Sequence, residues 1–213
     1  ENRGGAPQFL FNITMQNHGG YYASDYEWPV RVHEVSPVNS YDESVIAYES
    51  SVHMADESVR QLISYFETVD EPTVVLFFGD HEPRLSNEFY SSWFTDENDL
   101  DLEATAQLHK TPFFIWGNYN LNTESIQKGS VISLNYLSTV LFQTAGVQLS
   151  PYQQYLADLR LEHPVITARY FTTAFGDKVG TMPSAFTDSI REYQWLQYNC
   201  VFDRAHRIPG FYS

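Results

Sequence analysis

The stretch Val74-Val75-Leu76-Phe77-Phe78-Gly79-Asp80-His81-Glu82-Pro83 indicates the fold class of this chain. Its first five residues form an apolar run that lacks the alternation of a half-exposed strand. A strand buried on both faces, in a parallel sheet covered by helices, explains such a run. Gly79, Asp80 and His81 then lie at the carboxyl end of the strand, which is where open α/β sheets place their sites.

Alternating strands and helices are predicted around this stretch. Ser40 and Glu43 have the spacing of a capping box, and the apolar residues after them recur every three or four positions, as on one face of a helix. The order of elements predicts an α/β fold with a mostly parallel sheet flanked by helices. The expected strands span residues 9–15, 73–78 and 111–117, and the expected helices span residues 40–66 and 133–146, the second beginning at Ser133 and ending at Gly146.

The character of the chain changes after Ser150-Pro151. We therefore predict two domains, the main one over residues 1–150 and a small α+β subdomain over residues 151–213. The expected elements of the subdomain are a short helix over 152–161, a strand over 164–173, a turn at Gly176-Asp177, and a segment over 190–202 whose apolar spacing fits helix and strand equally.

The composition excludes several classes of protein. The 213 residues include 12 Lys and Arg against 27 Asp and Glu, which gives a formal net charge of −15, and 43% of the residues are hydrophobic. The apolar content is enough for a packed core, and the shortage of basic residues argues against a general nucleic-acid binder. The single cysteine, Cys200, excludes an intrachain disulfide and a cysteine-based zinc site. No apolar run has the length of a membrane span, and a strand-like segment so early in the sequence leads us to expect a chain cut from a longer protein.

Asp80 and His81 are the leading candidates for a metal site. Side by side at a strand end, they can converge on one cation, and a carboxylate oxygen with an imidazole nitrogen suits Zn, Mn or Fe. In the structural alternative, Asp80 caps the next turn and His81 is simply packed. His18 follows another predicted buried strand and could face the same cleft, because the ends of neighbouring parallel strands lie on one edge; alternatively it is an exposed loop residue without function.

The remaining candidates have weaker patterns. Glu49 and His53 are four residues apart on the long helix, a spacing that can bind a metal, but a solvated face explains them better. Arg84 could meet a phosphate or pair with nearby acids. No nucleophile elbow, phosphate-binding glycine loop or His-Glu-x-x-His motif occurs. The candidates without a telling partner are Asp56, His33, His109, His163 and His206, and the aromatic residues that could line a substrate groove or a loop core are Tyr21, Tyr22, Tyr26 and Trp28.

Six segments carry a resemblance to a known family: residues 11–22 (FNITMQNHGGYY), 48–66, 74–83 (VVLFFGDHEP), 111–117 (TPFFIWG), 133–146 (SLNYLSTVLFQTAG) and 192–198 (EYQWLQY). In order and spacing they resemble the lipoteichoic acid synthase family, sulfatase-like phosphoglycerol transferases of the alkaline phosphatase superfamily. The resemblance implies an alkaline-phosphatase/sulfatase-like fold, of which this chain would hold the C-terminal part. Gly20 stands where the family has proline in the His18 loop, and Asn135 stands where an acid is common.

The resemblance implies roles for three residues. Asp80 and His81 would be two ligands of a divalent cation, usually manganese in this family. His18 would contact the substrate phosphoryl group or assist the leaving alkoxide. The family's threonine nucleophile, its glutamate metal ligand and its membrane-spanning region belong to an N-terminal segment absent here. We therefore assign no catalytic nucleophile in this chain, and we expect the 213 residues alone to bind metal weakly and to be inactive.

The implied chemistry is a double displacement on the extracellular face of a bacterial cell membrane. A threonine takes phosphoglycerol from a phospholipid headgroup, and a hydroxyl of a glycerophosphate polymer or glycolipid acceptor then takes it from the threonine, which builds a cell-envelope polymer; the metal neutralises charge on the phosphoryl oxygens. The alternatives are a phosphoethanolamine transferase, a sulfatase, or a non-catalytic domain that binds glycan or lipid headgroups through the aromatic loop. No nucleic-acid partner is expected, and membrane contact is expected only through the absent N-terminal region. An open strand edge with exposed apolar faces predicts self-association.

Overall fold

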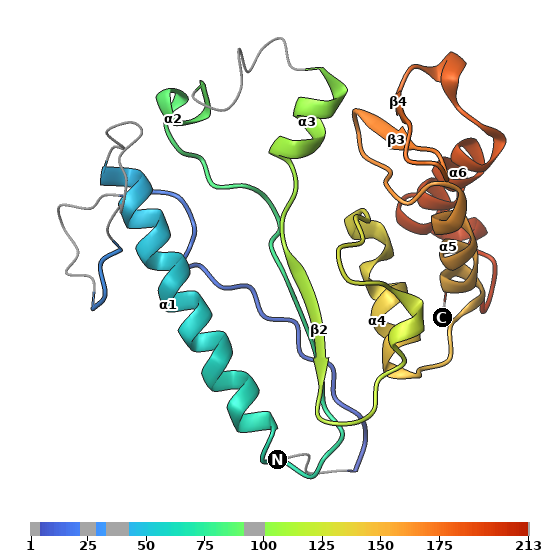
Figure 1. Ribbon diagram of the computed structural model, residues 1–213. Coiled ribbons are helices and arrows are strands. Elements are labelled where there is room, and N and C mark those ends of the chain that lie inside the picture. The colour runs from blue at the N-terminus through green and yellow to red at the C-terminus, as the bar shows by residue number, and fades with distance from the viewer. Residues whose placement is uncertain (1–4, 22–28, 33–42, 92–100, 213) are drawn as a thin grey trace. The chain divides into compact units, whose positions relative to one another are not determined.

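The computed structural model of the chain describes residues 5–21, 29–32, 43–91 and 101–212 (Figure 1). The chain divides into two compact units. The first comprises residues 1–68 and 81–99, and the second comprises residues 69–80 and 100–213. The domain boundary expected after residue 150 stays a prediction.

A long helix, α1 (Glu43–Phe66), is the longest element of the first unit and confirms the helix expected there. The Ser50 hydroxyl, buried in its first half, accepts a hydrogen bond from the backbone N–H of Val32 at 3.1 Å, which anchors the preceding segment to the helix. A short helix, α2 (Asn87–Ser91), belongs to the same unit. The predicted capping residue Ser40 lies outside the described residues.

Residues 9–15, predicted as a buried strand, have no regular secondary structure. The side chains of this segment are exposed, with Phe9 at 80% and Leu10 at 89%. A strand forms where a neighbouring strand satisfies its backbone hydrogen bonds, and no strand among the described residues pairs with this segment. The strand prediction and the burial expected with it are therefore wrong for this structure, because apolar and β-branched composition favours a strand but does not supply a pairing partner.

Two strands, β1 (Val74–Phe78) and β2 (Phe113–Gly117), form the sheet that precedes the predicted metal site. They pair antiparallel along their whole length, and the rings of the opposite residues Phe77 and Phe114 stack with centroids 5.3 Å apart. The positions of both strands are confirmed, whereas the expected parallel pairing is wrong for this pair. The expected burial of β1 on both faces is also wrong, because the strand is half-buried and Phe77 is 37% exposed. An apolar run specifies neither the direction of the neighbouring strand nor what covers its faces.

Asn118 fastens the end of this two-stranded ladder. Its side-chain oxygen accepts the N–H of Thr73 at 2.7 Å, and its side-chain nitrogen donates to the carbonyls of Val69 at 2.8 Å and Glu71 at 3.0 Å. One amide side chain thus satisfies three backbone groups of the segment that enters β1.

Helical segments that follow β2 form the larger core of the second unit. Its buried members are Tyr136, Leu156, Leu159 and Tyr193. Before β2 the second unit contains α3 (Leu102–Leu108). After β2 the α-helices and strands are α4 (Leu137–Ala145), α5 (Pro151–Glu162), β3 (Tyr170–Thr172), β4 (Lys178–Gly180) and α6 (Asp188–Val201), and the short 3₁₀ turns are Thr123–Ser125, Leu134–Tyr136, Pro183–Ala185 and Arg204–His206.

The helix expected over 133–146 begins later than predicted. Ser133 does not cap it; the Ser133 hydroxyl instead accepts the N–H of Ile166 at 3.0 Å and so holds a distant segment. Gly146 ends the helix as predicted, in the left-handed conformation with φ 73°, where a side chain would be strained.

The C-terminal elements follow the sequence closely. The helix expected over 152–161 and the turn at Gly176 (φ 91°) are confirmed, and β3 and β4 form the antiparallel hairpin on either side of that turn. The strand expected over 164–173 is confirmed only for Tyr170–Thr172, with a single bridge to Ile166. The segment over 190–202 is the helix α6, with Ile190 and Tyr193 buried on one face.

Candidate functional site

The predicted site begins at Gly79, where the backbone packs closely against the residue that precedes β2. The Gly79 N–H donates to the Pro112 carbonyl at 3.1 Å, and the Thr111 hydroxyl donates to the Gly79 carbonyl at 2.8 Å. A Cβ added at Gly79 would lie 2.9 Å from the Thr111 Cβ, closer than two such atoms approach. Glycine is therefore needed here for close approach, and the exit of the chain toward Asp80 is fixed by it.

We expect Gly79→Ala to lower the free energy of unfolding by about 1–3 kcal/mol, the usual cost of forcing an extra carbon into a packed place. Gly180→Ala is the matched control, because a Cβ at Gly180 meets nothing within 4 Å. Urea denaturation followed by tryptophan fluorescence measures both. Equal stability of the two variants would contradict the role assigned to the contact with Thr111.

Asp80 and His81 have exposed side chains directly after β1. The His81 Nδ1 lies 2.8 Å from the Glu82 carbonyl oxygen. A carbonyl only accepts, so Nδ1 carries the hydrogen and the lone pair of the neutral ring is on Nε2. A backbone carbonyl that orients the ring in this way is the usual second partner of a metal-ligating histidine.

His18 lies on an exposed turn in the first unit, where the backbone N–H of His18 donates to the Met15 carbonyl at 3.1 Å. Gly20 two residues later has φ 107°. Proline is fixed near φ −65°, so proline could not occupy this backbone. Gly20, which stands where the lipoteichoic acid synthase family has proline, therefore has a backbone conformation that only glycine adopts with ease.

The His18 loop is held on α1 by its neighbours. The Asn17 side-chain nitrogen donates to the Ser51 hydroxyl at 3.0 Å, and the Tyr21 hydroxyl donates to the Asn17 carbonyl at 2.8 Å. The Tyr21 ring meets the Tyr48 ring edge-on, with centroids 5.4 Å apart. These contacts fix the base of the loop while the His18 side chain stays exposed.

Tyr48 and Glu82 also join this neighbourhood, and sequence reasoning did not single them out. Burial raises the pKa of Tyr48, and the Glu82 carboxylate raises it further. Burial likewise raises the pKa of Glu82, opposed by His81. The structure therefore brings the loop of His18 and the residue after His81 to the same part of α1. The adjacency of Glu82 to His81 was a signal in the sequence, whereas no sequence signal pointed to Tyr48.

The described residues contain no group of three or more His, Cys, Asp and Glu side chains that could hold a metal ion. Asp80 and His81 offer a suitable pair of donor atoms, a carboxylate oxygen and an imidazole nitrogen, but a protein site needs three or four ligands. Their sharing of one cation stays a prediction. Of the weaker candidates, Glu49 and His53 lie on α1 as expected, and His33, Tyr22, Tyr26 and Trp28 lie outside the described residues.

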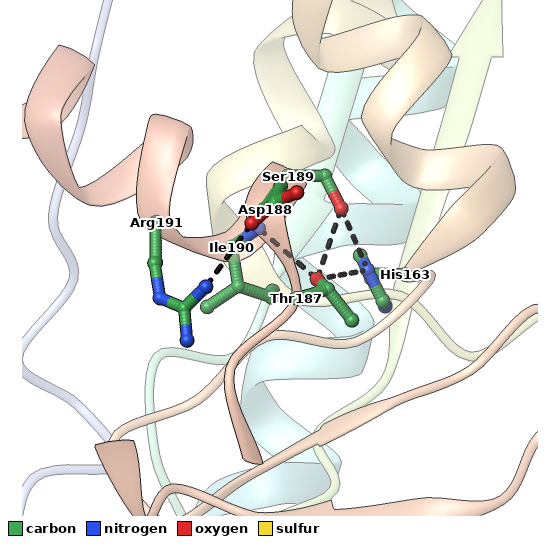
Figure 2. Close-up of polar contacts among 6 residues, drawn as sticks. All are labelled: His163, Thr187, Asp188, Ser189, Ile190 and Arg191. Atoms are coloured by element: carbon green, nitrogen blue, oxygen red, sulfur yellow. Dashed lines mark hydrogen bonds and ion pairs between the residues drawn. The ribbon is translucent and has the colours of Figure 1, made fainter. Parts of the chain in front are cut away.

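His163 makes several contacts that the sequence did not reveal, and Figure 2 shows those to Thr187 and Ser189. The side chain is buried, and its Nδ1 lies 2.8 Å from the Thr172 carbonyl, which makes Nδ1 the donor. Nε2, left with the lone pair, lies 3.1 Å from the hydroxyls of both Thr187 and Ser189, which also hydrogen-bond each other at 3.0 Å. Phe171 packs edge-on against the ring at 5.2 Å. His163 therefore joins the end of α5, strand β3 and the start of α6, and its role is structural.

No helix in the described part of the chain has the length and apolar character needed to cross a membrane.

Comparison with known proteins places the chain in a family. The family model for sulfatases matches residues 1–147, and the chain belongs to the sulfatase family. The predicted strand-end motif lies within the matched region. Members of this family generally use a divalent metal.

Two similar proteins are a curated relative and a solved structure. The relative is a protein of Rhizobium meliloti (strain 1021) that carries the name of a cyclic beta-1,2-glucan modification protein; it is 26% identical over 97% of this chain and 33% of its own length. The solved structure is the Streptococcus pyogenes phosphoglycerol transferase GacH in complex with sn-glycerol-1-phosphate, with a TM-score of 0.57, 16% identity, and coverage of 84% of this chain and 41% of that one. The chain thus spans a third of the relative's length, and the second likeness confirms the α/β sulfatase-like fold.

Proposed function

We propose that this chain is part of a metal-dependent phosphoglycerol transferase that modifies a glycan of the bacterial cell envelope. Membership of the sulfatase family, with Gly79-Asp80-His81 placed at the end of β1, is the observation that carries the proposal. The fold shared with a phosphoglycerol transferase and the similarity to a glucan modification protein support the choice of phosphoryl donor and of glycan acceptor.

In the proposed site, Asp80 and His81 hold a divalent cation, which we take to be manganese. The cation would supply positive charge to the phosphoryl oxygens, which a chain of net charge −15 otherwise repels. The Glu82 carbonyl keeps the hydrogen of His81 on Nδ1 and directs Nε2 to the cation. His18, exposed on a loop anchored through Asn17 and Tyr21, donates a proton or a hydrogen bond to the alkoxide that leaves.

The proposal assigns the nucleophile and the remaining metal ligands to parts of the full gene product other than these 213 residues. The reaction begins with a phospholipid headgroup as donor, whose bond between phosphorus and the lipid glycerol oxygen breaks as a bond to the nucleophile forms. A hydroxyl of the acceptor then displaces the nucleophile. We place the reaction on the extracellular face of the cell membrane.

The test supplies the full gene product with phosphatidylglycerol labelled in its headgroup, a β-glucan acceptor and Mn²⁺. We expect diacylglycerol release and transfer of label to the glucan, both lost with a chelator and restored by Mn²⁺. The 213 residues alone should give no turnover of a phosphodiester reporter. Cleavage of sulfate esters without phosphodiester turnover, or a metal-free active protein, would refute the proposal.

A further inference from the structure

Helix α6 carries apolar side chains on two opposite faces. Ile190 and Tyr193 are 3% exposed and pack into the core of the second unit. Trp195, Tyr198 and Phe202, by contrast, are 71%, 61% and 74% exposed. Their spacing of three and four residues places them in one row along the helix and its C-terminal cap. We call these three residues the aromatic row.

An ion pair at the start of the helix extends the same spacing toward the N-terminus. Arg191 lies four residues before Trp195, and its guanidinium donates to Asp188 at 3.1 Å (Figure 2). Asp188, Arg191 and the aromatic row therefore follow one another at spacings of three, four, three and four. At the other end the rings of Tyr198 and Phe202 lie 5.6 Å apart and tilted by 35°.

The chemistry of this face matches a neutral sugar. Each sugar ring has apolar C–H faces, which an aromatic ring with its negative π face attracts, and a rim of hydroxyls. The row offers three aromatic rings over about 10 Å of helix, since each residue rises 1.5 Å, with the Tyr198 hydroxyl beside them. Asp188 and Arg191, which precede the row, add a carboxylate acceptor and guanidinium donors, groups that hydrogen-bond to hydroxyls.

The charges of this face favour an uncharged ligand over an anionic one. The ion pair of Asp188 and Arg191 is neutral as a whole, and the chain has 27 acidic against 12 basic residues. Along residues 188–207 the charges balance as well, with three acids (Asp188, Glu192, Asp203) against three arginines (Arg191, Arg204, Arg207). The segment thus has no surplus of positive charge to attract an anionic polymer or an acidic lipid surface, whereas an uncharged glycan needs none. Exposed aromatic side chains gathered in one row, as these are, typically mark an interaction site.

We propose that the aromatic row of α6, with Asp188 and Arg191, is the docking site for a neutral glycan. As the acceptor of the transfer reaction, this glycan rests on the function proposed above; as a ligand of α6, it rests on the exposed rings themselves. The rings hold the chain of sugars in place while the hydroxyl that reacts is presented elsewhere.

The test measures binding of uncharged cyclic β-1,2-glucan to the 213-residue chain by titration calorimetry, without donor or metal. Trp195→Ala should weaken binding by about tenfold, the scale of losing one aromatic stacking contact, and Tyr198→Ala should weaken it by a smaller factor. Phe175→Ala is the matched control: Phe175 is 94% exposed but lies near the hairpin turn of β3 and β4, away from the row in sequence, so binding should be unchanged.

Several results would overturn the docking site. They are equal binding by wild type and Trp195→Ala, no binding by the wild type, binding of anionic vesicles instead of glucan, and a dimer in light scattering that Trp195→Ala abolishes while glucan does not bind. The outcome is separable from that of the transferase. Glucan binding without phosphoglycerol transfer would contradict only the proposed function. Transfer to a glucan that the row does not bind would contradict only the docking site.

Discussion

Asp80→Asn in the full gene product should lower phosphoglycerol transfer by about 10²- to 10³-fold, as should His81→Ala. A group that stabilises transition-state charge has this effect when it is removed. Both side chains are exposed at the end of β1, and the ring of His81 is oriented by the Glu82 carbonyl. The manganese content of the purified protein should fall with the rate, because each change removes a donor atom.

The matched control for this experiment is His53→Ala. His53 lies on the exposed side of α1, four residues from Glu49, in the one other predicted spacing that could bind a metal. We expect turnover and metal content of this variant to equal those of the wild type. Loss of metal with His53→Ala, and retention with His81→Ala, would move the metal site to the helix and contradict the assignment made here.

His163→Ala should lower the free energy of unfolding by about 3 kcal/mol. The change removes a buried ring, leaves the Thr172 carbonyl without its donor and opens a cavity beside Phe171. It also removes the ring nitrogen that lies against the hydroxyls of Thr187 and Ser189 at the start of α6. The measurement is chemical denaturation of the 213-residue chain, monitored by fluorescence and by circular dichroism.

Two further variants make this prediction specific. His109→Ala removes an exposed histidine and should change stability by less than about 0.5 kcal/mol, as surface substitutions do. His163→Gln keeps a side-chain donor and an acceptor and should lose less than His163→Ala. A loss below about 1 kcal/mol for His163→Ala would show that the three polar contacts contribute little and that the ring is held by packing alone.

The position of Asp80 and His81 at a strand end was predictable from the sequence, whereas the residues around them were not. An apolar run followed by Gly79-Asp80-His81 places two donor atoms at a strand end whatever the rest of the fold does. Tyr48 lies more than thirty residues earlier, on a helix face that periodicity assigns to ordinary packing. Its nearness to Tyr21 and to Glu82 is a tertiary fact.

The aromatic row was also only partly predictable from the sequence. Its spacing of three and four residues is visible in the sequence once the segment is known to be helical, but the sequence fitted helix and strand equally. Ile190 and Tyr193 share the same composition and the same helix, and they are buried. Which aromatic side chains face the core and which face solvent depends on where α5 and Tyr136 lie. The spacing of residues along α6 does not specify those positions.

The sequence by itself determined the family, the long helix, both strands of the first sheet and the residue types at the strand end. These follow from local periodicity, capping and apolar runs, which are properties of neighbouring residues. Only the tertiary structure decided that β2 returns antiparallel to β1, that residues 9–15 form no strand, and that His163 joins three elements. Strand direction, strand pairing and buried polar contacts each depend on a partner distant in sequence, and no local pattern encodes the position of such a partner.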